Sequence, residues 1–429
     1  MPYTVYRVLI TIFFFLVLLP ILPLILVFSR KYRYEFNQRL AWYPLIFPPA
    51  DYKKKAVWIH AASVGEVQAA KALILELSNR DLNLEFIVTT MTQQGHKVAC
   101  SQLPDHTICL LAPLDVPVFV QRALKRIGPD VYICMETELW PVMLHETKEF
   151  GVKMLLLNGR MSQRSFLRYS KFQSFMEELL SGFSAMGVIS EKDGQRYREL
   201  GFENSYIQVT GNIKYDLQVE DKLISRKKFR SRLGLEDETT FLCGSTRTGE
   251  EEILSRVFFR LQQESTKQIV WIVAPRHIER LEEVILLFKK LNLGFDLYST
   301  IKNKERVHSI ILIDCMGELA ELYAAGDYNF CGGSLVDKGG HNIMEAARFG
   351  KPVYFGPSMK DFHDAVEILK PVGAGFQVND ENALADLILS HMHNNNLYEN
   401  ACRAAARIAA QHHGAARRQA DMVTQLLAA

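Results

Sequence analysis

The sequence contains no Cys-x-x-Cys pair, and no cysteine is spaced with histidine as in a zinc site. These absences exclude the dithiol redox motif and the common structural zinc motifs. Most of the seven cysteines lie in apolar runs, which predicts buried free thiols in a reducing compartment. The sequence also lacks an excess of either charge, because its net charge is only +2. A nucleic-acid partner is therefore not expected, since such proteins carry a concentrated basic face.

One long apolar run stands near the N-terminus. Residues 8–29 contain no charged side chain and are about as long as a helix that crosses the core of a bilayer. No small-residue cleavage site follows, and the basic residues in 30–33 favour keeping that end cytoplasmic. We expect residues 1–30 to be a membrane anchor. Pro20 and Pro23 leave open whether the anchor spans the membrane or inserts from one side.

Downstream of this run, short apolar segments alternate with segments of helical periodicity. The alternation predicts strands joined by crossover helices, and hence parallel sheets covered on both faces. A charged stretch at 217–238 interrupts it, and we expect this stretch to be an interdomain linker. The expected strands are 56–60, 84–90, 108–111, 131–135, 154–157, 185–189 and 207–210 before the stretch, and 241–243, 269–273, 294–297, 310–313, 328–331, 353–355 and 375–377 after it.

The predicted fold class is therefore α/β, with two doubly wound domains of the Rossmann type. The expected domains are 31–216 and 239–395, and C-terminal helices follow at 396–429. Two such domains facing each other form a cleft. Ligands of such sheets bind outside the carboxyl ends of the strands, so the motifs that follow strands are the candidates for function.

The first acidic motif, His60–Glu66, directly follows the first expected strand. A strand, a loop of small residues and a helix place Glu66 at a helix N-terminus, beside backbone N–H groups. Two interpretations are open: an acid that favours the start of a helix, or a general base that deprotonates a hydroxyl in the cleft. The helix dipole alone would lower the pKa of Glu66, so a base also needs burial or a neighbouring carboxylate to raise it.

A second acidic motif, Met135–Pro141, follows the strand expected at 131–135. Glu136 and Glu138 are separated by one residue and precede Trp140 closely in the chain. Such a pair can bind a divalent metal, but no Asp-x-Asp or histidine joins the motif, so we expect no metal. We expect instead that one carboxylate orients substrate hydroxyls or stabilises positive charge developing on a sugar.

Basic side chains follow two later strands. If Ser162 caps a helix, Arg164 and Arg168 lie one turn apart on one face, either as a solvated surface or as a phosphate site. Lys214 ends the segment Gly211–Lys214 at the domain junction, where it can reach an anion in the cleft.

Loops rich in small residues follow strands of the second domain. Small residues let backbone N–H groups approach an anion closely, so these loops predict a phosphate or nucleotide site. For Glu345, a second interpretation is an acid in the first turn of a helix capped by Asn342. The loops are Gly244–Glu250, Ala274–His277, Asp314–Glu318, Cys331–Ser334 and Gly339–Glu345.

In order along the chain, these motifs resemble those of the 3-deoxy-D-manno-octulosonic acid (Kdo) transferase family, from about Lys31 to the C-terminal helices. The sequence departs from the common family pattern at Thr246–Thr248 and at Ser334–Lys338, which affects details of donor contacts and not the class. The motifs that carry the resemblance are Ala62–Glu66, Met135–Pro141, Asn158–Ser162, Gly211–Lys214, Gly244–Thr246, Ala274–His277 and Gly339–Glu345.

The resemblance implies a two-domain glycosyltransferase fold of the GT-B type. It implies inverting transfer of Kdo from CMP-Kdo to a lipid A precursor (lipid IVA) in lipopolysaccharide core synthesis, without a metal or another cofactor. Domain 31–216 would bind the acceptor, and domain 239–395 would bind the nucleotide sugar. The enzyme would be held on the cytoplasmic side of the inner membrane by its single N-terminal anchor.

The resemblance also implies residue roles. Glu66 matches the proton acceptor of the family, and Glu136 and Lys214 match residues with transition-state roles. Contacts to CMP carry over to Pro275, Arg276, Met316, Gly317, Glu318, Asn342, Ile343, Met344 and Glu345.

Two alternatives stay open at this point. One is a transferase of the same fold that uses a UDP-sugar on another lipid, and comparing CMP with UDP binding separates the two. The other is a membrane-tethered protein that binds a nucleotide sugar without turnover. The joint presence of Glu66, Glu136 and Lys214 argues against this sensor, because a sensor needs no base.

Overall fold

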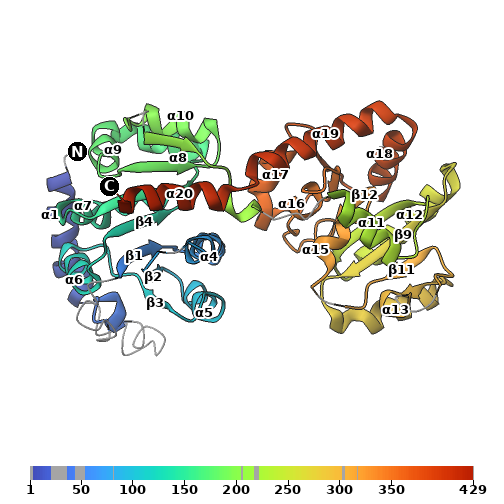
Figure 1. Cartoon of the computed structure of the whole chain (residues 1–429), viewed down its shortest axis with the longest axis horizontal. Helices are drawn as coiled ribbons and strands as arrows, with labels where there is room; N and C mark the ends of the chain where they lie inside the picture. Colours follow the sequence, from blue (N-terminus) through green and yellow to red (C-terminus); the bar gives the residue numbers. More distant parts are fainter. Residues whose placement is uncertain are drawn as a thin grey trace. The chain divides into compact units, whose positions relative to one another are not determined.

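The structure is a computed structural model that describes residues 3–20, 36–43, 54–80, 82–203, 206–216, 222–301, 305–315 and 317–428. It divides into two compact units (Figure 1). The first unit is Met1–Asp216 together with Gly414–Ala429, and the second is Leu217–His413. Each unit contains a parallel sheet with helices, so the predicted α/β class with two domains is confirmed.

The sheet of the first unit has the strand order β3-β2-β1-β4-β5-β6-β7, and each neighbouring pair is parallel. The chain builds outward from β1 to β3, returns to β4, and then builds outward on the other side. The strand order therefore reverses between β1 and β4. The strands are β1 (Lys55–His60), β2 (Leu84–Thr90), β3 (Thr107–Leu111), β4 (Val131–Met135), β5 (Lys153–Gly159), β6 (Ala185–Val188) and β7 (Ile207–Val209).

Local sequence sets where the helices of this unit begin. The side chains of Ser63, Thr92, Ser162 and Ser190 each accept a hydrogen bond from a backbone N–H in the first turn that follows. Ser162 therefore does cap a helix, which is the condition under which Arg164 and Arg168 lie on one helical face. The helices are α4 (Val64–Ser78), α5 (Gln93–Gln102), α6 (Pro117–Ile127), α7 (Pro141–Glu149), α8 (Gln163–Tyr169), α9 (Gln173–Leu180), α10 (Glu191–Glu199) and α20 (Ala415–Ala428).

Alternation along β1 divides the core of the first unit between the two faces of its sheet. Val57 and Ile59 belong to one buried cluster, which also receives residues of α4 and α20. Trp58 belongs to the cluster on the other face, where its ring meets Tyr132 edge to face at 5.1 Å between centroids. Burial on both faces explains why these strands are continuous apolar runs.

The second unit repeats the same architecture with the strand order β10-β11-β9-β8-β12-β13-β14. Here the order reverses between β8 and β12. Its strands are β8 (Thr239–Thr246), β9 (Ile269–Pro275), β10 (Asp296–Leu297), β11 (Ile310–Leu312), β12 (Tyr328–Cys331), β13 (Val353–Phe355) and β14 (Gly375–Gln377). Its helices are α11 (Lys222–Arg232), α12 (Glu250–Glu264), α13 (Leu281–Lys290), α14 (Tyr298–Ile301), α15 (Leu319–Leu322), α16 (Met344–Ala347), α17 (His363–Leu369), α18 (Glu381–His393) and α19 (Asn395–His412).

The division into units differs from the expected domains in two places. The stretch expected as a linker contains α11, which belongs to the second unit: Phe229 is buried there, and Arg226 forms an ion pair of 2.7 Å with Asp327. The expected C-terminal segment 396–429 divides between the units. Helix α19 stays in the second unit, whereas α20, drawn in red in Figure 1, packs on α4 and β5 of the first unit.

The N-terminal helix consists of α1 (Tyr3–Phe13) continuing into η1 (Phe14–Leu18). One face packs on the first unit, where Tyr3 stacks on His145 at 3.5 Å and Arg7 forms an ion pair of 3.3 Å with Glu146. In the ranges that the structure describes, no helix combines the length and the apolar character needed to cross a membrane. Residues 21–30 of the expected anchor lie outside those ranges.

Candidate functional site

The carboxyl ends of β1 and β4 lie side by side, where the strand order of the first unit reverses. His60 of β1 is in register with Cys134 of β4. Glu66 follows β1 by one loop and lies in the first turn of α4, and Glu136 directly follows β4. A reversal point of this kind is where open α/β sheets bind ligands. The topology therefore brings the two acidic motifs to one place.

The Glu66 side chain is fixed by its own loop. Its Oε1 accepts a hydrogen bond from the Ser63 hydroxyl at 2.8 Å, and its Oε2 accepts one from the Ala62 N–H at 2.9 Å. The Glu66 N–H lies 3.4 Å from the Ser63 oxygen, which completes a reciprocal cap at the start of α4. The side chain is held in one orientation and is only 5% exposed.

Burial is the main cause that raises the pKa of Glu66, to about 7. The charges of Glu136 and Glu138 raise it further, whereas the hydrogen bonds from Ser63 and Ala62 lower it. The sequence alone left open whether burial or neighbouring carboxylates would offset the helix dipole, and the structure contains both. A carboxyl group with this pKa exchanges a proton near neutral pH, as a general base requires.

Glu136 has a backbone conformation that is uncommon for a residue with a side chain. Its φ is +56°, in the left-handed region, and its N–H donates to the Leu157 carbonyl at 2.9 Å. Its carboxylate forms an ion pair with the Lys214 ammonium. Strained backbone of this kind gathers at functional sites. In this protein, the strained residue is Glu136, directly after the last residue of β4.

Lys214 reaches this place because the segment after β7 is anchored to β5. The side-chain oxygen of Asn158 accepts the Ile213 N–H at 2.9 Å, and that of Asn212 accepts the Lys214 N–H at 3.0 Å. A Cβ atom added at Gly65 would lie 3.1 Å from the Lys214 Nζ, so the ammonium lies against the loop that leads into Glu66. The structure therefore brings together Glu66, Glu136 and Lys214.

Glu138 and Trp140 form one side of this site. The Trp140 indole N–H donates to Oε2 of Glu138 at 2.8 Å, and the Cys134 thiol donates to the Glu138 carbonyl at 3.1 Å. Burial raises the pKa of Glu138, the Trp140 hydrogen bond lowers it, and the charge of Glu136 raises it. Two carboxylates with an aromatic wall provide the mixed polar and apolar surface that a sugar ring needs.

The glycine-rich loop of the second unit differs from the prediction. The Glu250 carboxylate accepts hydrogen bonds from the backbone N–H groups of Gly333, Ser334 and Leu335, at 2.6, 3.0 and 3.0 Å. It also accepts the Arg247 N–H at 2.9 Å. The prediction that the Cys331–Ser334 loop offers its N–H groups to a bound anion is wrong, because an acid of the protein already fills that position.

A cationic cluster lies at the carboxyl ends of β8, β9 and β12 instead. We use this name for Arg247, Arg276, His277 and His341. Nη1 of Arg247 lies 2.6 Å from Nε2 of His277, and a Cβ atom added at Gly333 would lie 3.3 Å from His341 and 3.6 Å from Arg247. Burial and the charges of Arg276, Arg247 and His277 lower the pKa of His341 to about 4. His341 is therefore neutral at pH 7, and the two arginines provide the permanent charge for a phosphate.

The residues predicted to contact a nucleotide divide by exposure. Arg276 and Gly317 are exposed. Pro275, Ile343 and Met344 are buried, so the side chains of these three residues pack in the core.

The predicted carboxylates of this group have partners within the unit. Oε2 of Glu318 accepts the Tyr298 hydroxyl at 2.8 Å and lies 3.6 Å from Arg232. Burial raises the pKa of Glu345, while Arg348, Arg276 and Asn342 lower it. Asn342 caps the next turn by accepting the Met344 N–H at 3.1 Å, and Met316 lies outside the described residues.

The loops predicted to bind a phosphate contain Arg247, His277 and His341, but sequence reasoning did not single out these three side chains. Arg247 follows β8 and His341 lies in the Gly339–Glu345 motif, so both follow strands that meet where the order reverses. The available signal was their position after a strand. What was missing was the knowledge that β8 and β12 are neighbours.

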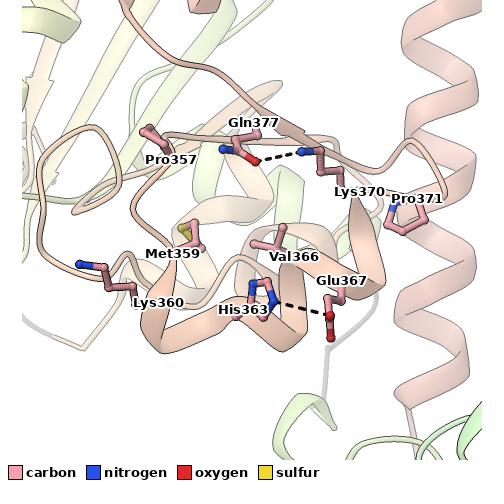
Figure 2. A pocket seen from close by; sticks show the side chains of 9 residues that line it. All are labelled: Pro357, Met359, Lys360, His363, Val366, Glu367, Lys370, Pro371 and Gln377. Atoms are coloured by element: carbon pink, nitrogen blue, oxygen red, sulfur yellow. Dashed lines mark hydrogen bonds and ion pairs between the residues drawn. The ribbon is translucent and has the colours of Figure 1, made fainter. Parts of the chain in front are cut away.

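A cavity of about 840 Å³ lies beside these loops in the second unit (Figure 2). It is lined by residues that follow β13, by helix α17 and the two residues after it, and by Gln377 of β14. Met359 in its wall contacts Gly340. Figure 2 shows two pairs among its polar side chains: Lys370 lies 2.9 Å from Gln377, and His363 lies 3.5 Å from Glu367. Lys360 is paired with Asp337 at 2.9 Å. Because these charges have partners, the cationic cluster is the better candidate for binding an anion.

Comparison with known proteins gives consistent similarities over most of the chain. Residues 34–217 match the family model described as 3-deoxy-D-manno-octulosonic-acid transferase (kdotransferase). A 3-deoxy-D-manno-octulosonic acid transferase of Haemophilus influenzae is 32% identical over 413 residues, covering 94% of this chain and 96% of the relative. One from Rickettsia felis is 33% identical over 351 residues, covering 81% and 74%.

Among solved structures, one with low sequence identity shows the same fold over most of the chain. The UDP-GlcNAc 2-epimerase of Neisseria meningitidis, bound to UDP-GlcNAc, matches 87% of this chain and 99% of its own, with a TM-score of 0.52 and 13% identity. The C-terminal CMP-Kdo binding domain of WaaA from Acinetobacter baumannii is 27% identical, covers 44% of this chain and 97% of its own, and has a TM-score of 0.40.

Proposed function

Because the chain belongs to the 3-deoxy-D-manno-octulosonic acid transferase family and is therefore a glycosyltransferase, we propose that it transfers Kdo from CMP-Kdo to a hydroxyl of a lipid A precursor, with inversion and without a catalytic metal. The observation that carries the proposed chemistry is the buried Glu66 carboxylate, fixed by its loop beside the pair of Glu136 and Lys214. This step belongs to the synthesis of the lipopolysaccharide core.

Glu66 is the general base of the proposed reaction. A hydroxyl oxygen of the acceptor forms a bond with the anomeric carbon of Kdo, and its proton moves to the Glu66 carboxylate. The bond from that carbon to the phosphate oxygen of CMP breaks, and its electron pair leaves with CMP. The attack and the departure occur on opposite faces of the sugar, so the configuration inverts.

Glu136 and Lys214 stabilise charge in this step. The anomeric carbon becomes positive as the bond to CMP lengthens, and a fixed carboxylate at position 136 favours that charge. Lys214 holds this carboxylate in place through their ion pair and carries the positive charge that the leaving phosphate requires. Both groups are set before reaction by the backbone that follows β4 and β7.

The cationic cluster of the second unit is the proposed phosphate site for cytidylate. Incubation with CMP-Kdo and a tetraacylated lipid A precursor, followed by mass spectrometry, tests the whole proposal: the product must gain the mass of Kdo. Calorimetry with CMP and UDP separates this function from a transferase of UDP-sugars. CMP binding without any product would instead support a sensor.

We also propose that the N-terminal helix attaches the protein to the cytoplasmic face of the inner membrane. Its outward side chains are apolar and exposed, among them Leu9, Ile12 and Leu16. Helix α6 contacts this helix through Phe119, which meets Phe14 at 5.1 Å, and its last turn carries Lys125 and Arg126. Apolar side chains beside basic ones match the surface of a membrane with anionic lipids.

Arg276→Ala is expected to weaken CMP binding by a factor of about ten or more, because a charged hydrogen bond to a phosphate contributes about 1.5–3 kcal/mol. Isothermal calorimetry on the purified protein measures the change. Arg260→Ala is the matched control, since Arg260 lies on α12 and pairs with Glu264 and Asp386. Unchanged CMP affinity in Arg276→Ala would remove Arg276 from the donor site.

The pH dependence of transfer follows from the raised pKa of Glu66. The deprotonated carboxylate accepts the proton, so kcat/KM is expected to rise with pH to a plateau, with a midpoint near the pKa of about 7. Glu138→Gln removes a charge that raises this pKa, so its midpoint is expected at lower pH. Glu149→Gln, an exposed change at the end of α7, should leave the midpoint in place. A profile without a rise between pH 5.5 and 8.5 would contradict the assignment.

A further inference from the structure

A second cavity of the molecule, of about 520 Å³, lies in the first unit between the N-terminal helix and the loop that follows β4. The helix contributes Tyr6, Ile10 and Phe14, one per turn along one face. Leu139 and Trp140 line it from the loop. Its volume lies within the range of about 300–1,000 Å³ that is typical of small-molecule sites.

The two carboxylates that line this cavity, Asp115 and Glu138, already have hydrogen-bond partners, and that of Glu138 is the Trp140 indole described above. The Asp115 carboxylate accepts the N–H groups of Val142 and Met143 at 3.1 and 2.7 Å and so caps α7. The remaining surface near the helix is aromatic and aliphatic. Such a lining favours an apolar ligand, because a polar one would lose its hydrogen bonds with water.

One end of the cavity adjoins the reaction site proposed above. Thr137 and Glu138 line it and immediately follow Glu136 in the chain. The Thr137 hydroxyl donates to the Arg160 carbonyl, which fixes this end of the loop. A ligand in the cavity would therefore have its polar end near Glu136 and Glu66 and its apolar end under the N-terminal helix.

The other face of the same helix is apolar and open. Leu9, Ile12 and Leu16 are 54%, 48% and 72% exposed. They alternate around the helix with Tyr6, Ile10 and Phe14, which face the first unit. The helix thus separates a surface suited to lipid from a cavity suited to a hydrocarbon chain.

We propose that this cavity binds one acyl chain of the lipid acceptor and so positions the acceptor hydroxyl beside Glu66. The inference rests on the proposed function and adds a residue-level site for the acceptor. An acyl chain is the occupant that fits all three observations. The cavity has an apolar lining near the helix, one of its ends lies beside the catalytic carboxylates, and the N-terminal helix that covers it has an exposed, apolar outer face.

Kinetics with two acceptors tests the site. Ile10→Trp fills the cavity from the helix, and Leu139→Trp fills it from the opposite wall. For each variant, KM for the tetraacylated precursor is expected to rise about tenfold, equivalent to losing the burial of about two methylene groups, whereas KM for its fully deacylated form stays unchanged. Leu9→Trp is the matched control, because the same substitution falls on the outward face of the same helix.

Labelling gives a measurement that does not need turnover. A precursor with a diazirine at the end of one acyl chain is photolysed with the full-length protein in phospholipid vesicles, without donor. Labels competed by unmodified precursor are expected at residues 6–14 and 137–141, and they should be lost in Ile10→Trp and kept in Leu9→Trp. Competed labels that map only to other segments would overturn the site.

The outcomes separate the two proposals. A wild-type protein that transfers no Kdo to either acceptor refutes the proposed function. A wild-type protein that transfers Kdo, but whose two cavity-filling variants change KM equally for both acceptors, refutes the acyl-chain site alone. Equal kcat/KM of the wild type for the acylated and deacylated acceptors also refutes it.

Discussion

Glu66→Gln is expected to lower the kcat of Kdo transfer by a factor of about 10² to 10⁴, the range that a positioned general base contributes. The amide has the same shape as the carboxylate but cannot take up the proton of the acceptor hydroxyl. Glu66 is 5% exposed, and its two oxygens accept hydrogen bonds from Ser63 and Ala62, so the side chain is held in a single orientation for this role.

The substitution leaves the fold in place for a specific reason. Glu66 is the third residue of α4 and forms a reciprocal cap with Ser63. Glutamine also occurs at this position of such caps. Removing a buried carboxylate with a raised pKa also removes a group whose charged form is disfavoured by burial. Thermal unfolding and CMP binding of Glu66→Gln are therefore expected to match the wild type.

Glu76→Gln is the matched control for this variant. Glu76 lies on the same helix and pairs with Arg80 at 3.4 Å on the surface. It should retain full activity, because this partly exposed ion pair lies on the helix away from the site, and i,i+4 pairs of this kind contribute little even to stability. Near-normal kcat of Glu66→Gln at neutral pH, with normal folding, would show that another group accepts the proton.

The strands of the first unit show which features can be predicted from the sequence. The expected segments 84–90 and 131–135 coincide with β2 and β4, because a strand buried on both faces is a continuous apolar run bounded by polar loops. The positions of Glu66 and Glu136 after strands follow from the same pattern. Their proximity does not, since it requires β1 and β4 to be neighbours although β2 and β3 lie between them in the chain.

Two other features depend on contacts distant in the sequence. Helix α20 has an apolar face that predicts burial, but a periodic pattern does not reveal that the partner is α4 of the first unit. Glu250 looks like any acid in the first turn of a helix. Its partners at Gly333, Ser334 and Leu335 are 83 to 85 positions away, so the local pattern misassigned that loop to an anion.

The backbone of Glu136 could not be predicted either. A φ of +56° is disfavoured for a residue with a Cβ atom, and no local turn signal such as glycine or asparagine marks it. The surrounding structure imposes it, through the Leu157 carbonyl on one side and the Lys214 ion pair on the other. Sites where local preference is overruled in this way are where sequence reasoning is expected to fail.

Lys214→Met is expected to lower kcat by a factor of about 10² to 10³, the effect of removing one preorganised group that stabilises charge in a transition state. It also leaves the Glu136 carboxylate without its ion-pair partner in a place where Glu136 is largely buried. We therefore expect a lower melting temperature as well as slower transfer. Lys192→Met, which removes an exposed lysine on α10, should change neither.

The double variant Glu136→Gln/Lys214→Met separates the structural contribution of this pair from the catalytic one. It leaves no uncompensated charge, so its melting temperature is expected to recover toward that of the wild type. If Lys214 only held Glu136 in place for folding, activity would recover together with stability. We expect stability without activity, because the double variant has neither the carboxylate for the developing positive charge on the sugar nor the ammonium for the leaving phosphate. A double variant as active as the wild type would show that the pair acts only on the fold.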